Sequence, residues 1–158
     1  MIQRKQSLYL FLVTIICLVM LIGGLPLFKG TLKQGIKYTV LVTSGSLETG
    51  LGIKETENTS LVILLVVIAL TSFFALFLYK KQKLQLRFVA LNFLLMGLSV
   101  FVMFQSYNQF NEKIGLMIHS TQYQPALFLP VVLVLLNVLA YRGIKKDIDL
   151  LASVDRLR

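Results

Sequence analysis

Uncharged apolar runs alternate with charged segments along the whole chain. Four runs lack Asp, Glu, Lys and Arg, and they are Ser7–Phe28, Asn58–Tyr79, Phe88–Asn111 and Ile114–Tyr141. A helix that crosses the hydrocarbon core of a bilayer needs about 20 mainly apolar residues. The pattern therefore predicts an integral membrane protein with four transmembrane helices, at about residues 7–28, 59–79, 88–110 and 124–142.

The loop between the first two runs, residues 29–57, has a different period. Ile36, Tyr38, Val40 and Val42 occupy every second position, and Ser44-Gly45-Ser46 follows them. Alternation with a period of two around a glycine turn predicts a β-hairpin. The expected fold class is thus an all-α membrane protein, a four-transmembrane-helix bundle with an extracytoplasmic β-hairpin in its first loop.

The C-terminal segment continues the helical pattern. Gly143 is the only breaker after the fourth run, and Ile144, Ile148, Leu151 and Val154 recur on one helical face. We expect a cytoplasmic helical tail over residues 143–158 and a single membrane domain over residues 1–158.

Composition agrees with a membrane protein and bears on its partners. Hydrophobic residues make up 56% of the chain and charged residues 15%, whereas soluble domains carry about 25%. The net charge of +9 has a simple source, because basic residues flank spans and set their orientation. Arg4, Lys5, the basic loop at 80–87 and the C-terminal tail fall on one side, which the positive-inside rule places in the cytoplasm. We expect contact with membrane lipids and none with nucleic acid.

Residues that carry chemistry are scarce. Cys17 is the only cysteine and His119 the only histidine, and neither has a metal-ligating neighbour in the sequence. No span pairs a nucleophile with a base, and none contains an ionisable group near its middle. We therefore expect a protein that is not an enzyme, with no catalytic residue, no metal site and no cofactor.

Two amides stand out inside the spans. Asn92 lies five residues from Arg87, and Asn137 lies five residues from Arg142, so the two amides share one depth. Because lipid offers neither amide a partner, we expect an interhelix pair between them. The alternative is a polar pocket for a headgroup or an ion.

The two termini carry a family resemblance. The chain matches a characteristic pattern at Gln3, Arg4, Gln6, Lys145, Lys146, Asp147, Ser153, Asp155, Arg156, Leu157 and Arg158. It departs at Ile148, where an acid is expected. The pattern resembles a family of small four-span bacterial inner-membrane proteins, chiefly from the Bacteroidetes, known as domain of unknown function family 4293. The resemblance implies the cytoplasmic (inner) membrane of a bacterium and no known activity.

The charged ends suggest a docking surface. Arginine makes planar, bidentate contacts that suit a defined partner. The candidate docking residues are Arg4, Lys145, Lys146, Asp147, Asp155, Arg156 and Arg158. A solvated basic tail near anionic lipid is the alternative. The sequence favours a structural or accessory subunit of a membrane assembly, with two alternatives: a small oligomeric transporter or channel component, and a lipid-acting membrane enzyme.

Overall fold

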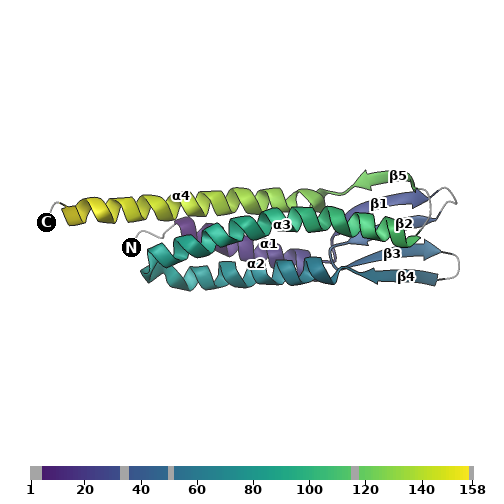
Figure 1. Ribbon diagram of the computed structural model, residues 1–158, viewed down its shortest axis with the longest axis horizontal. Coiled ribbons are helices and arrows are strands. Elements are labelled where there is room, and N and C mark those ends of the chain that lie inside the picture. Colours follow the sequence, from purple (N-terminus) through teal and green to yellow (C-terminus); the bar gives the residue numbers. More distant parts are fainter. Residues whose placement is uncertain (1–4, 33–35, 50–51, 115–117, 157–158) are drawn as a thin grey trace.

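The computed structural model describes residues 5–32, 36–49, 52–114 and 118–156. The molecule is elongated, with helices side by side at one end and a β-sheet at the other (Figure 1). The elements in chain order are α1 (Lys5–Ile22), β1 (Pro26–Leu32), β2 (Lys37–Leu41), β3 (Ser44–Thr49), β4 (Gly52–Glu57), α2 (Thr59–Phe77), the short 3₁₀ helix η1 (Leu78–Lys80), α3 (Gln82–Ile114), β5 (Ile118–Tyr123), the 3₁₀ helix η2 (Pro125–Phe128) and α4 (Leu129–Arg156).

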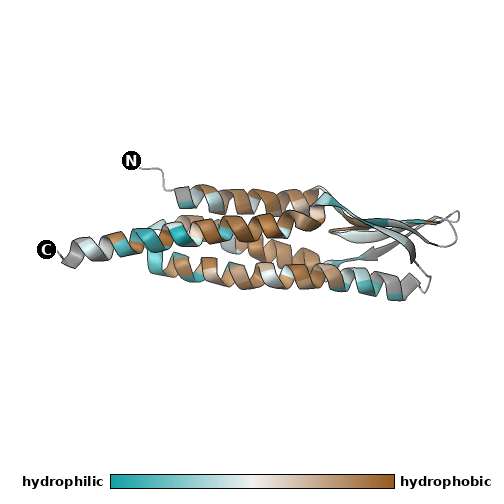
Figure 2. Ribbon diagram, turned by 90° about the horizontal axis from the view of Figure 1, so that it is seen from above, coloured by the Kyte–Doolittle hydropathy of each residue, from teal (hydrophilic) through white to brown (hydrophobic). Residues whose placement is uncertain are grey.

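The helices form a ring in which α1 and α3 each pack against α2 and α4. Their middle section is hydrophobic, and hydrophilic residues gather on the sheet and at the far end of α4 (Figure 2). In the described part of the chain, three helical segments are long and apolar enough to cross a membrane: Thr59–Phe77, Gln82–Gln109 and Pro125–Leu150. These segments are consistent with a membrane protein.

The sheet has five strands in the order β4-β3-β2-β1-β5, and every neighbouring pair is antiparallel. β1 lies between β2, its neighbour in sequence, and β5, which arrives after α2 and α3. The register pairs Gly30 of β1 with Tyr38 of β2 on one side and with Thr121 of β5 on the other. One edge strand of the sheet, β5, therefore comes from a distant part of the chain.

The expectation of an all-α, four-span fold is wrong. The first uncharged run divides into a helix and a strand, and the helical part, Gln6–Ile22, is shorter than the three segments that could cross a membrane. The expected loop after α3 contains β5. The expected hairpin does pair as β2 and β3, but it forms the middle of a larger sheet. Its turn lies two residues before Ser44-Gly45-Ser46, because Val40 already pairs with Gly45.

Glycines explain why the first helix stops early. The Gly23 N–H donates to the Val19 carbonyl at 2.9 Å, which completes the last turn of α1. Gly24 then has a φ of 49°, a left-handed conformation that favours glycine at the end of a helix. Pro26, which cannot continue a helix, opens β1. An uncharged run can thus hold a helix stop that a count of apolar residues overlooks.

The sheet sits directly on the helical layer. α3 has 33 residues, so at 1.5 Å per residue it is about 50 Å long and exceeds a bilayer core of about 30 Å. The C-terminal part of α3 packs on β1. There the centroid of the Phe28 ring lies 4.6 Å from that of Tyr107 and 6.2 Å from that of Phe104. The Val42 N–H donates to the Leu25 carbonyl at 3.0 Å, which connects the residue after β2 to the residue before β1.

Asn58 joins the sheet to α2. Its amide nitrogen donates to the Leu41 carbonyl at 2.9 Å, and its backbone N–H donates to the Thr43 carbonyl at 3.0 Å. Its own carbonyl accepts the first backbone bonds of α2, from Leu61 and Val62. This buried residue therefore connects the end of β2 with the beginning of a hydrophobic helix.

Candidate functional site

The predicted docking residues of the tail lie on or beyond the last turns of α4. Lys145 and Lys146 are exposed, and Asp147 is half-buried. Arg4 and Arg158 lie outside the described residues, as do the side chains of Asp155 and Arg156, although α4 itself continues to Arg156. Of the seven predicted residues, the structure thus places the first three of the tail.

Asp147 has a partner that the sequence did not identify. The side-chain nitrogen of Gln6 donates to its carboxylate at 2.6 Å and connects the beginning of α1 to α4. Gly143 lies one turn away and allows this contact, because a Cβ there would lie 3.3 Å from the Cβ of Gln6. Gln6 is buried, so the N-terminal end of α1 is fixed against α4.

The two buried amides have separate partners instead of each other. Asn92 donates to the Ser72 hydroxyl at 2.8 Å and accepts a hydrogen bond from the Thr71 hydroxyl, so it joins α3 to α2. Asn137 donates to the Val89 carbonyl at 2.9 Å and joins α4 to α3. The expected Asn92–Asn137 pair is thus replaced by two interhelix contacts, since each amide reaches a closer partner on the helix beside it.

Three buried amide oxygens have acceptor capacity left over. In the described part of the chain, the side-chain oxygens of Gln6, Gln85 and Asn137 have no hydrogen-bond partner. Each of these side chains uses its nitrogen instead, and that of Gln85 donates to the Ala75 carbonyl at 3.0 Å. The interhelix hydrogen bonds of these three side chains are therefore made by their nitrogens.

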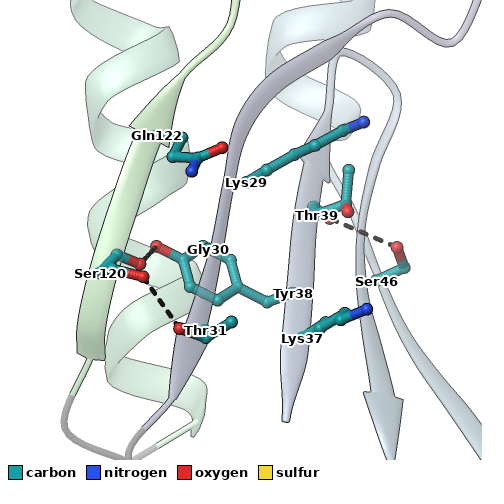
Figure 3. Close-up of a pocket in the computed structure, with 9 residues that line it drawn as sticks. All are labelled: Lys29, Gly30, Thr31, Lys37, Tyr38, Thr39, Ser46, Ser120 and Gln122. Carbon is teal, nitrogen blue, oxygen red and sulfur yellow. Dashed lines mark hydrogen bonds between the residues drawn. The ribbon is translucent and has the colours of Figure 1, made fainter. Parts of the chain in front are cut away.

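A second candidate site lies on the sheet, at the opposite end of the molecule. An open pocket of about 390 Å³ lies on β1, β2, β3 and β5 (Figure 3). Its polar side chains come from β1, β2 and β3, which follow one another in sequence, and from β5, which is distant in sequence but adjacent to β1 in the sheet. The residues that line it are Lys29, Gly30, Thr31, Lys37, Tyr38, Thr39, Ser46, Ser120 and Gln122.

Strand alternation separates the two faces of the sheet. Phe28, Tyr38 and Val40 are buried, and the ring of Phe28 packs on the α3 aromatics. Lys29 and Lys37 are exposed and take the alternate positions, so they belong to the open face. The alternation in the sequence predicted β2, but the segment of β5 was expected to be a loop, so the contribution of Ser120 and Gln122 to the pocket was missed.

Hydroxyl groups hold the pocket strands together. On the open face, the hydroxyls of Thr31 and Ser120 lie 2.9 Å apart, and the Ser46 hydroxyl donates to the Thr39 carbonyl at 3.3 Å. On the α3 side, the Thr121 hydroxyl lies 2.8 Å from that of Tyr38 and 2.9 Å from that of Tyr107. Burial raises the pKa of Tyr38 to about 12, so its hydroxyl stays protonated near neutral pH.

Among the described residues, no group of three or more His, Cys, Asp and Glu side chains could hold a metal ion. Cys17 is buried in the helical core. What the described side chains offer is a sheet pocket lined by two lysines and several hydroxyl groups, and a charged helix end on α4.

Comparison with known proteins gives a family without an assigned activity. No curated protein and no solved structure matches the chain. The model of one family, described as a domain of unknown function (DUF4293), matches residues 2–157. Because this match covers nearly the whole chain, the protein belongs to the DUF4293 family.

Proposed function

We propose that the protein is a non-enzymatic membrane subunit that docks onto a protein partner through the free end of α4. The observation that carries this proposal is that α4 extends past the other helices at the end opposite the sheet (Figure 1). Among the α4 side chains that the structure describes, Ile148 is the last that packs against the hydrophobic core, and the helix then runs eight residues further, to Arg156. At 1.5 Å per residue this extension is about 12 Å long.

The exposed side of α4 has a composition that suits protein contact. Exposed residues recur at helical spacing over three turns, namely Arg142, Lys145, Lys146, Asp149, Leu150 and Ser153. Leu150 lies beyond the core, and its apolar side chain is 55% exposed. A mixture of charges around an exposed leucine resembles the polar rim and apolar centre of an interface. A helix that only anchors to lipid has a continuous apolar face instead.

We further propose a location in the cytoplasmic membrane of a bacterium, with the α4 extension in the cytoplasm. Lys81, Lys83 and Arg87 follow the turn between α2 and α3, at the same end as the α4 extension and opposite the sheet (Figure 1). Basic residues next to spans are retained in the cytoplasm. The resemblance at the termini supports the bacterial assignment.

Truncation of the full-length protein tests the docking proposal. Removal of Leu150–Arg158 keeps Lys145 and Lys146 for orientation and Asp147 for its contact with Gln6. We expect unchanged membrane insertion and thermal stability in detergent, together with loss of a stoichiometric partner after native purification. A Leu150→Glu variant should have the same effect, and Leu94→Glu, on an exposed lipid-facing position of α3, should impair insertion instead.

The same purification separates the alternatives. If the truncated protein keeps every partner and supports wild-type growth, the extension is a passive charge anchor near anionic lipid. A symmetric homo-oligomer without a partner would favour a pore. A monodisperse protein that retains one lipid species would favour an enzyme or a carrier.

A further inference from the structure

The pocket on the open face of the sheet is lined by basic and hydroxyl side chains. The described polar side chains that line its pocket are two lysines, four hydroxyl residues and Gln122, together with Tyr38, and none of them is acidic. Lys29 and Lys37 are both exposed. The Ser46 hydroxyl donates to the Thr39 carbonyl, and one hydroxyl of the Thr31–Ser120 pair donates to the other. The donors that can point toward the pocket are therefore the two lysines, Gln122, the Thr39 hydroxyl and the second hydroxyl of that pair.

The two lysines are neighbours across strands. Lys29 pairs directly with Thr39, and Lys37 is two residues from Thr39 on β2. Such diagonal positions place Cβ atoms about 7–8 Å apart. Lysine side chains are long enough to bring both ammonium groups to one small anion over this distance. The Lys29–Gln122 pair of the β1–β5 register adds an amide donor on the other side.

The floor of this pocket is held in place. Tyr38 crosses Gly30 from beneath and bonds to Thr121, which connects the three strands on the α3 side. Thr31 and Ser120 connect β1 with β5 on the open side (Figure 3). Because the strands are fixed, an incoming ligand does not have to order the backbone, and binding loses less entropy.

The position of the pocket points to a water-soluble ligand. β1 begins at Pro26, just after the helical layer, and its strand continues the long axis of the molecule (Figure 1). At about 3.3 Å per residue, Lys29 lies about 10 Å and the Thr31–Lys37 pair about 16 Å beyond Pro26. The headgroup layer adds only about 5–7 Å on each side of the hydrocarbon core. With the edge of the hydrocarbon core placed at Pro26, where the helical layer ends, the phosphates of ordinary lipids lie below Lys37.

We propose that this sheet pocket binds an oxyanion, the phosphate or carboxylate group of a small water-soluble molecule. The lysines neutralise its charge, and the hydroxyls and Gln122 bond to neighbouring oxygens of the same molecule. Lysine is an established ligand of phosphate. The site is independent of the α4 extension, since the two lie at opposite ends of the molecule.

Titration with inorganic phosphate tests this site. The full-length protein in phosphatidylcholine nanodiscs is titrated at constant ionic strength with sodium chloride as the reference salt. We expect saturable backbone amide shifts at Lys29–Thr31, Lys37–Thr39 and Ser120–Gln122. Lys29→Gln and Lys37→Gln should each weaken binding about fivefold, because each removes a charged donor. Lys83→Gln, an exposed lysine at the other end, should leave the affinity unchanged.

A third variant tests whether charge controls the site. Glu48 stands opposite Lys37 in the β2–β3 register. Facing positions lie about 5 Å apart at Cβ, so removal of a negative charge raises the local positive potential. Glu48→Gln should therefore tighten phosphate binding.

Two results would overturn the proposal. One is a set of shifts that do not saturate, or that Lys29→Gln and Lys37→Gln alter no more than Lys83→Gln does. The other is a response to phosphatidylglycerol in the nanodisc without any response to inorganic phosphate, which would assign the lysines to a lipid headgroup.

Discussion

The ring of Tyr38 lies across Gly30, its direct partner in the β1–β2 register. A Cβ at position 30 would lie 2.6 Å from the Tyr38 hydroxyl oxygen and would also overlap the Ser120 carbonyl. A glycine at this point therefore lets one aromatic side chain reach over a strand to Thr121. This contact connects the hairpin strand β2 to the distant strand β5 and determines the shape of the polar pocket above it.

Gly30→Ala should destabilise the sheet by about 1–3 kcal/mol, because the added methyl group has no space and backbone atoms would have to move. Unfolding of the purified protein in detergent, followed by a fluorescent label on the sheet, measures this change. Gly97→Ala is the matched control, since nothing lies within 4 Å of a Cβ at that helical position. Equal stability of the two variants would show that Tyr38 moves aside without cost.

The stability of the sheet should fall in alkaline solution. Burial raises the pKa of Tyr38 to about 12 from its ordinary value of 10.0. A folded-state pKa above the unfolded one means that the stabilisation is complete below pH 10 and is lost as the pH rises from about 10 to about 12. The difference in unfolding free energy between wild type and Tyr38→Phe should shrink over this window. A difference that is constant with pH would contradict the buried position of the hydroxyl.

The helix contacts of the two asparagines should be energetically separate. A double-mutant cycle between Thr71→Val and Asn92→Leu should give a coupling energy near the membrane average of about 0.6 kcal/mol, because these side chains bond directly. A cycle between Asn92→Leu and Asn137→Leu should be additive, since the two amides share no partner. Unfolding in mixed micelles measures both. Coupling in the second cycle alone would contradict this account and would indicate a direct hydrogen bond between Asn92 and Asn137.

The sequence predicted a helix in each of the four uncharged runs, and it predicted that the fourth continues through Gly143 into the tail. It was less informative about the strands. Leu27 and Phe28 belong to an uncharged run, so they were assigned to a span, although Gly23, Gly24 and Pro26 are an ordinary helix stop. Hydropathy counts apolar residues and does not register a change of backbone conformation within a run.

The candidate site was harder still to predict. β5 contains Ser120, Thr121 and Gln122, and such a polar segment resembles a loop until it has a strand to pair with. That strand, β1, lies some ninety residues earlier, and a pairing across this separation leaves no local pattern. For the same reason, Gln6 and Asp147 could each be noted in the sequence, but their hydrogen bond depends on how α1 packs on α4.

Site-specific photo-crosslinking along α4 in living cells is the most direct test of the docking function. A photoreactive residue is placed at Leu150 or Ser153 on the exposed side, at Ile148 on the core-facing side, and at Leu94, which is 70% exposed on the membrane-spanning part of α3. We expect one discrete protein adduct of the same mass from positions 150 and 153 and none from positions 148 and 94. Lipid adducts alone at 150 and 153, or the same protein adduct from all four positions, would contradict docking through the end of α4.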